Sequence, residues 1–241
     1  MTHSNRWMAA FSFGVFACGA MALYVAYNRP EPPADAAAAD SQIVILSSDA
    51  DPKHPVTDKM LEVTGRMASV AAPLFEAQAA DGRTVRLADL LGRGKPIVMI
   101  SVLDGCPCNT DAQPLFNRLY DRYRHAAHFL NVIASPIEKA QIWAHEHDLQ
   151  YPILADPDLK ILRPYKSERS VYVTLIRPDG GIDKMWPGYS ADMLIELDTK
   201  LAQITGLDVP RFDPLYAPTK LSSGCQIFSG EAVPPNADAN H

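Results

Sequence analysis

The longest apolar stretch of the chain lies near its N-terminus, where residues 7–27 carry no charged side chain. At about 1.5 Å per residue, a helix of this length spans about 30 Å, which is the thickness of the hydrocarbon core of a bilayer. Trp7, Tyr24 and Tyr27 stand near its ends, where aromatic side chains favour the membrane interface. The pattern predicts one N-terminal transmembrane helix within a first segment, residues 1–28.

Two processing alternatives compete with this uncleaved anchor. The small residues around Cys18 fit a signal-peptide cleavage site, and Cys18 itself fits the lipidated cysteine of a lipoprotein. However, the apolar run continues for nine residues beyond Cys18, where a mature lipoprotein would be polar. Arg6 before the span and acidic residues after it favour an N-terminus inside the cell. We expect a single-pass protein of the inner membrane whose folded domain faces the periplasm, on the extracytoplasmic side.

Residues 29–69 form a second segment that begins with a stretch rich in proline and alanine, NRPEPPADAAAAD. This stretch has too few large apolar side chains to fold and is typical of a semi-rigid tether. Further along, residues 42–47 fit a short strand, and residues 57–67 fit a helix with Thr57 as its N-cap. The apolar face of that helix would carry Met60, Leu61 and Met67.

From about residue 70 the pattern is typical of buried strands that alternate with amphipathic helices. Residues 95–103 are a continuous apolar run, as expected for a strand buried on both faces of a sheet, and residues 128–134 fit a second buried strand. Between them, apolar side chains recur at helical offsets, at Ala112, Leu115, Phe116, Leu119, Tyr120 and Tyr123. Pro114 should kink this helix, because it lacks an N–H and clashes with the preceding turn.

A second helix is expected directly after residues 128–134. Ser135 fits its N-cap, Pro136 its first position and Glu138 the partner of Ser135 in a capping box. This helix should run to about His147.

The last third of the domain predicts a hairpin and a final helix. Residues 171–177 and 181–186 fit two strands joined by a tight turn, and Ser190 fits the cap of the helix that follows. The apolar stripe of that helix is formed by Leu194, Leu197, Leu201 and Ile204.

The predicted order is therefore β-α-β-α-β-β-α. Strands joined through helices should pair in parallel, and strands joined by a tight turn should pair antiparallel. This predicts an α/β domain over residues 70–206, with a mixed central β-sheet flanked by helices. Residues 207–241 are rich in proline and fit an extended C-terminal extension.

The charge of the chain argues against one class of function, the binding of nucleic acids. The formal net charge is −6 and the sequence contains no basic block, so nucleic-acid binding is not expected.

Two of the four cysteines stand close together in the sequence VLDGCPCNTDAQP, where the first buried strand meets the first helix. The N-terminus of a helix offers free N–H groups and a positive dipole end, which stabilise a thiolate and lower a cysteine pKa from about 8.5 to roughly 3.5–7.5. With Cys106 as N-cap, Pro107 falls at the first helical position, and the amides of Cys108 and Asn109 should face the Cys106 sulfur. The pattern predicts Cys106 as the stronger nucleophile.

This order of elements, with cysteines at the first strand–helix junction, resembles the thioredoxin superfamily. The closer likeness is to its redoxin branch, which includes peroxiredoxins and membrane-tethered extracytoplasmic thioredoxins. The likeness is carried by the stretches APLFEAQAADGRTVRLADLLGRGKPIVMIS, YPILADPD and VTLIRPDGGI. It implies a thioredoxin-like fold and disulfide exchange with protein thiols through Cys106 and Cys108, with no cofactor.

The cysteine stretch departs from the usual thioredoxin pattern. Family members with Cys-x-x-Cys carry a proline eight residues after the first cysteine, and Pro114 stands at that distance from Cys106. The second cysteine would fall on Asn109, whereas this chain has Cys108 one residue earlier. The usual tryptophan before the first cysteine and the usual cis-proline before the third strand are replaced by Gly105 and Val171.

A thiol peroxidase is the first alternative activity, with peroxide as the substrate. Peroxiredoxins place Pro and Thr seven and three residues before the reactive cysteine. The corresponding positions before Cys106 and Cys108 hold Met99, Leu103, Ser101 and Gly105. Arg169 is the basic residue nearest to the place of the family's guanidinium, and it is offset.

A copper-binding module is the second alternative, since Cys106 and Cys108 could hold Cu(I) between two thiolates. Copper-delivery relatives use a wider cysteine spacing and a histidine before the later strands, whereas residues 164–176 contain none. The histidines of the domain fit solvated surface groups better than ligands: His125, His128, His145 and His147.

Cys225, in the sequence LSSGCQIF, is the third cysteine beyond the predicted span. It could resolve a disulfide with Cys106 or Cys108 if the C-terminal extension folds back, and a free buried thiol is the alternative. A disulfide between Cys106 and Cys108 should be strained, because the ring is small and Pro107 fixes φ near roughly −65°. A bond from Cys106 to Cys225 would avoid that strain.

Overall fold

The computed structural model describes residues 52–229. The predicted membrane span, Cys18 and the expected strand at residues 42–47 lie outside this range. Within residues 52–229, no helix combines the length and the apolar character needed to cross a membrane.

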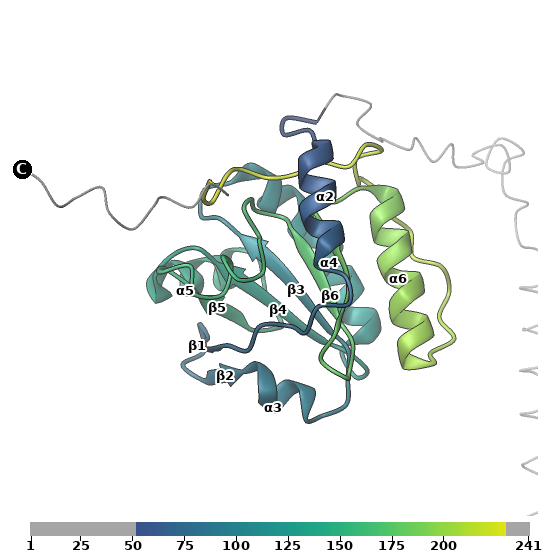
Figure 1. Ribbon diagram of the computed structural model, residues 1–241, viewed down its shortest axis with the longest axis horizontal. Helices are drawn as coiled ribbons and strands as arrows, with labels where there is room; N and C mark the ends of the chain where they lie inside the picture. Colours follow the sequence, from purple (N-terminus) through teal and green to yellow (C-terminus); the bar gives the residue numbers. More distant parts are fainter. Residues whose placement is uncertain (1–51, 230–241) are drawn as a thin grey trace, which may run out of the picture. The chain divides into compact units, whose positions relative to one another are not determined.

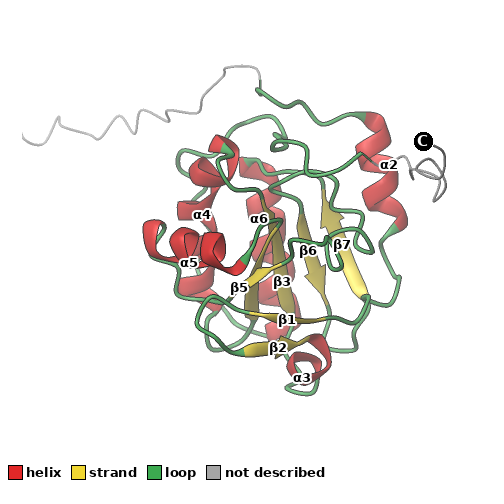
Figure 2. Ribbon diagram, turned by 90° about the vertical axis from the view of Figure 1, so that its left-hand side faces the viewer, coloured by secondary structure: helices red, strands yellow, loops and turns green. Residues whose placement is uncertain are grey.

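A five-stranded mixed sheet forms the centre of the domain, with the strand order β5-β4-β3-β6-β7 (Figures 1 and 2). Its middle strand, β3 (Ile97–Val102), is buried along its whole length. It pairs in parallel with β4 (His128–Ile133) and antiparallel with β6 (Val173–Ile176). At the edges, β5 (Ile153–Ala155) runs parallel to β4, and β7 (Ile182–Trp186) runs antiparallel to β6. The predicted α/β domain with a mixed central sheet is confirmed.

Helices and loops cover both faces of this sheet, because successive side chains of a strand point to opposite sides. Val98 and Ile100 pack in one core cluster with α4 (Pro107–Tyr123) and α6 (Ala191–Thr205). Ile97 and Met99 pack in a second cluster, which holds buried side chains of α2 and of the loop between β5 and β6. Because both faces of β3 are covered, its sequence is a continuous apolar run.

The first helix, α2 (Asp58–Arg66), has the predicted capping residue. The Thr57 side chain accepts a hydrogen bond from the Met60 N–H at 3.3 Å, and the Met60 sulfur accepts one from the Thr57 N–H. Met60 and Met67 are buried as predicted, whereas Leu61 is 48% exposed. Leu61 was wrongly assigned to the apolar face because it stands about 100° around the helix from Met60.

α5 (Ile137–Glu146) begins later than predicted. Pro136 is its N-cap, and no side chain caps it. The Ser135 N–H bonds to the carbonyl oxygen of Ile133 at 2.8 Å, which holds Ser135 in the turn after β4. The capping box of Ser135 and Glu138 is therefore wrong.

The direction of β6 also differs from the prediction. α5 connects β4 in parallel to β5, a three-residue strand that the sequence analysis did not identify. The loop over residues 156–172 then reverses the chain, so β6 runs antiparallel to β3. The antiparallel pairing of β6 and β7 was predicted correctly.

Three short elements between α2 and β3 were also not predicted. β1 (Glu76–Gln78) and β2 (Thr84–Arg86) form a separate antiparallel pair, and α3 (Leu87–Leu91) follows directly.

The last helix of the domain, α6, begins as predicted. The Met193 N–H donates to the Ser190 hydroxyl at 3.2 Å, and Leu194, Leu197 and Leu201 are fully buried. The helix ends at Gly206, whose φ of +69° is the left-handed conformation that glycine adopts without a steric penalty.

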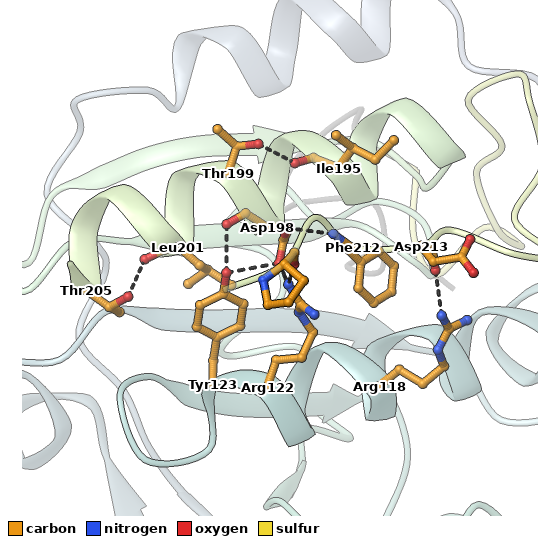
Figure 3. A network of polar contacts seen from close by, with 11 residues as sticks. Arg118, Arg122, Tyr123, Ile195, Asp198, Thr199, Leu201, Thr205, Phe212 and Asp213 are labelled. Carbon is orange, nitrogen blue, oxygen red and sulfur yellow. Dashed lines mark hydrogen bonds and ion pairs between the residues drawn. The ribbon is translucent and has the colours of Figure 1, made fainter. Parts of the chain in front are cut away.

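After α6 the chain runs back along the helix towards the edge of the domain where α2 begins (Figure 1). A buried carboxylate holds the start of this extension, as Figure 3 shows. Asp198 on α6 accepts hydrogen bonds from the Tyr123 hydroxyl at 2.9 Å and the Phe212 N–H at 3.1 Å, and it pairs with Arg122 at 3.1 Å. The guanidinium of Arg118 lies 5.1 Å from the centre of the Phe212 ring. The extension is thus fixed to α4 and α6 before it reaches Cys225.

Candidate active site

Cys106 is the N-cap of α4, and Pro107 is the first residue of the helix, as predicted. Gly105 precedes it with a φ of +71°, so a glycine rather than a tryptophan suits this bend. The capping role of the sulfur is at most minor, because the Cys106 side chain accepts no capping hydrogen bond of normal geometry and the Asn109 amide has the smallest effect on its pKa. The Asn109 amide donates instead to the Cys106 carbonyl oxygen at 3.1 Å.

Two donors from distant parts of the chain bond to the Cys106 sulfur. The Ser170 hydroxyl lies 3.1 Å from Cys106 Sγ, and the backbone N–H of Cys225 lies 3.3 Å from it. Burial raises the pKa of Cys106, but hydrogen bonds from Ser170 and from the Cys225 thiol and amide outweigh it, with the smallest effect from the Asn109 amide. The pKa of Cys106 therefore lies below the usual value for a thiol.

Cys108 lies in the first turn of α4 and is also buried. Burial raises its pKa to about 11, and the negative charge of Cys106 adds to the effect. Since the thiolate is the nucleophile, Cys108 is the weaker of the two at neutral pH.

The C-terminal extension folds back over this site and brings Cys225 to Cys106. Residues 222–228 form what we call the strap, which pairs with the loop before β6. The Ser170 N–H donates to the Cys225 carbonyl at 2.9 Å, and the Gly224 N–H donates to the Ser170 carbonyl at 3.0 Å. A Cβ atom on Gly224 would collide with the Ser170 hydroxyl, which explains the glycine before Cys225.

The thiol of Cys225 differs from that of Cys106 in its protonation. Burial raises its pKa to about 11, and the hydrogen bond to Cys106 and the Cys106 charge act in the same direction. Arg169 opposes this change. Its guanidinium donates to the Gly224 carbonyl at 3.1 Å, so the residue considered for a peroxide site instead holds the strap.

His54 is a residue of the site that the sequence analysis did not identify. Its Nε2 lies 3.5 Å from Cys225 Sγ, and its carbonyl accepts a hydrogen bond from the Ser223 N–H at 2.9 Å. No local signal distinguishes it, because it lies outside the predicted domain and precedes Cys225 by 171 residues. The four histidines considered earlier make none of the contacts of this site.

Asn109 and Val171 occupy the positions where thioredoxins usually have the second cysteine and the cis-proline. The Asn109 side chain accepts from the Leu103 N–H and donates to the Ser101 carbonyl, both at 3.0 Å, and so fixes α4 to the end of β3. Val171 has a φ of +64°, and the described residues contain no cis peptide bond. A β-branched residue in this conformation costs about 1–3 kcal/mol, and such strain is common at functional sites.

Within residues 52–229, no group of three or more His, Cys, Asp or Glu side chains is arranged to hold a metal ion.

Comparison with known proteins agrees with this fold. Residues 68–185 match the AhpC/TSA family. No curated protein matches the chain significantly in sequence. This family match and the structural likeness described next agree with the resemblance to the redoxin branch of the thioredoxin superfamily.

Three solved structures illustrate the structural likeness. A Bacteroides thetaiotaomicron protein assigned as a protein disulfide isomerase has a TM-score of 0.54 at 20% identity, covering 58% of this chain and 91% of its own. A Chlorobium tepidum protein assigned as the thiol:disulfide interchange protein DsbE has a TM-score of 0.53 at 18% identity, with coverages of 58% and 98%. DsbF of Mycobacterium tuberculosis has a TM-score of 0.50 at 20% identity, with coverages of 57% and 100%. At these identities the likeness concerns the fold alone.

Cys106 is expected to be the first of the three thiols to be alkylated at neutral pH, because its pKa is lowered while those of Cys108 and Cys225 are raised. The measurement is the alkylation rate against pH for single serine variants of each cysteine, in a Cys18→Ser background. A low-pKa thiol that survives in Cys106→Ser, and is lost in Cys108→Ser, would reverse the assignment.

Proposed function

We propose that the protein is a thiol–disulfide oxidoreductase in which Cys106 attacks a disulfide of a partner protein. The observation that carries this proposal is the Cys106 sulfur, held by the Ser170 hydroxyl and the Cys225 amide, with a lowered pKa and a second thiol beside it. The attack forms a mixed disulfide and releases one partner sulfur as a thiolate. A second cysteine of the chain then displaces the other partner sulfur, so that the partner is reduced and the chain is oxidised.

Cys225 is the better second cysteine in this scheme. Its backbone N–H donates to the Cys106 sulfur at 3.3 Å, a contact that Cys108 does not make, whereas the thiols of both Cys225 and Cys108 interact with Cys106. A Cys106–Cys108 disulfide would instead close a small ring that contains Pro107. Cys108 therefore serves as a buried neighbour of the reactive pair, and Cys106–Cys225 is the exchanging couple.

The strap must move during the reaction. Cys106 is only 1% exposed, so a partner disulfide reaches its sulfur when residues 222–228 separate from the loop before β6. The strap is held by backbone hydrogen bonds to His54, Glu168, Ser170 and Tyr189. Such a segment can open locally without global unfolding.

The comparisons support this class of activity. Two of the structural neighbours are named for disulfide isomerisation or interchange, and DsbF was solved in mixed oxidised and reduced forms. A thiol peroxidase is the second candidate function, because the chain matches the AhpC/TSA family and places the Ser170 hydroxyl on the Cys106 sulfur.

One assay with two substrates separates these activities. The reduced full-length chain, in mild detergent, is mixed either with a disulfide-bonded peptide or with hydrogen peroxide, and the copper content of the sample is measured. We expect fast stoichiometric reduction of the peptide disulfide and slow reaction with peroxide. A reaction with peroxide that is faster than with every disulfide tested would favour the peroxidase, and stoichiometric copper that blocks both reactions would favour the metal-binding module.

The proposed setting is the outer side of the inner membrane, with residues 7–27 as an uncleaved anchor. We expect the full-length chain in the membrane fraction, and we expect its folded domain to be digested by protease added to the periplasmic side. Recovery of a soluble mature protein without residues 7–27 would contradict the anchor. Protection of the domain until the inner membrane is opened would contradict the orientation.

A further inference from the structure

The second step of the proposed exchange requires a base, because a thiolate rather than a thiol attacks a disulfide. Cys225 is held as a thiol and therefore needs a proton acceptor, and the basic group beside it is an imidazole. His54 Nε2 lies 3.5 Å from Cys225 Sγ. Two backbone contacts hold the two residues together, since the Ser223 N–H bonds to the His54 carbonyl and Pro55 forms an antiparallel bridge with Ser222. The segment that carries the imidazole is thus paired with the strap that carries the thiol.

We propose that His54 is a catalytic general base that removes the proton of Cys225 when Cys225 attacks the mixed disulfide, an inference that rests on the proposed function. In this step the Cys225 proton moves to His54 Nε2, and the Cys225 sulfur bonds to the Cys106 sulfur. The bond between Cys106 and the partner sulfur breaks, and the partner leaves as a thiolate that takes up a proton from the imidazolium or from water. The partner disulfide gains two electrons, and the Cys106–Cys225 pair loses them.

The contacts also explain why His54 acts in the second step rather than the first. In the reduced chain the Cys225 thiol is hydrogen-bonded to Cys106, and the negative charge of Cys106 opposes a second thiolate beside it. Once Cys106 is part of a mixed disulfide, that charge is gone, and the proton of Cys225 can pass to His54. The other charged group that acts on Cys225 is Arg169, which favours its thiolate. Cys108, whose own pKa is raised, is held as a thiol.

An aromatic disulfide tests this step directly, because each displaced nitrothiobenzoate is coloured. The full-length chain with Cys18→Ser and Cys108→Ser is reduced and mixed rapidly with dithiobis(nitrobenzoate) in mild detergent. The first release reports the attack by Cys106, and the second reports the attack by Cys225. In His54→Gln the second release should slow by about 10²-fold, the usual contribution of a general base, while the first changes by less than about twofold. His145→Gln, at an exposed position of α5, is the matched control and should change neither release.

The pH profile separates a base from a packing residue. In His54→Gln the second release should become faster as the pH rises, because hydroxide then removes the Cys225 proton. The difference in second-release rate between His54→Gln and the unsubstituted chain should therefore shrink. A second release that is unchanged in His54→Gln, a deficit that is equal at every pH, or an equal slowing of both releases would overturn the role of His54. If the unsubstituted chain gives no first release, the proposed function itself fails, and that outcome is distinct from the others.

Discussion

Replacing Cys106 with serine is expected to slow disulfide exchange by at least about 10³-fold, the scale seen when a catalytic nucleophile is removed. The reason is that burial, the largest cause of the raised pKa values of Cys108 and Cys225, remains in the variant, so neither thiol replaces the Cys106 thiolate at neutral pH. The measurement is the rate of reduction of a disulfide-bonded peptide by the full-length reduced chain.

Two serine variants serve as controls for this result. Cys225→Ser should still attack the peptide but should accumulate the mixed disulfide, because the second step is lost. Cys108→Ser should keep both steps, and its rate should stay within about tenfold of the unsubstituted rate. Cys108 is a buried thiol whose sulfur takes no part in the exchange. A Cys106→Ser variant that keeps its activity, or a Cys108→Ser variant that loses as much, would contradict the assignment.

Replacing Asp198 with alanine is expected to lower the free energy of unfolding by about 3–5 kcal/mol, the usual result of removing one partner of a buried ion pair. Asp198 has a side chain that is 6% exposed and accepts hydrogen bonds from Arg122, Tyr123 and Phe212. Its removal leaves the Phe212 N–H without that acceptor and Arg122 without its carboxylate. The measurement is the midpoint of urea unfolding of the full-length chain in mild detergent, monitored by tryptophan fluorescence.

Asp213→Ala is the matched control, because Asp213 is exposed and its side chain accepts only a local hydrogen bond from the Leu215 N–H. This variant should change stability by less than about 1 kcal/mol. Because Asp198 fixes the start of the extension, Asp198→Ala should also weaken the placement of Cys225. Equal stabilities for the two variants would contradict the role given to Asp198.

The parts of the fold that could be predicted are those with strong local signals. β3 and β4 are rich in apolar residues because both of their faces are covered, and the Ser190 cap precedes a regular apolar stripe. β5 was missed because three residues next to a proline are too few to show a period. The direction of β6 was wrong for the same reason, since β5 is the strand that α5 reaches in parallel.

The same distinction applies to the site: features set by neighbouring residues could be predicted, and those set by distant residues could not. The N-cap position of Cys106 follows from the neighbouring residues, and so it was predicted. Its donors are the Ser170 hydroxyl and the Cys225 amide, which stand 64 and 119 residues away along the chain. His54 stands 171 residues from Cys225, so only the folded chain places the imidazole beside the Cys225 thiol.

The pairing of Cys106 is the central claim of this account, and disulfide mapping tests it most directly. The full-length chain with Cys18→Ser is reduced, oxidised with one equivalent of a partner disulfide, blocked with an alkylating reagent and digested for mass spectrometry. We predict a Cys106–Cys225 disulfide with an alkylated Cys108. A Cys106–Cys108 disulfide with an alkylated Cys225 would contradict it.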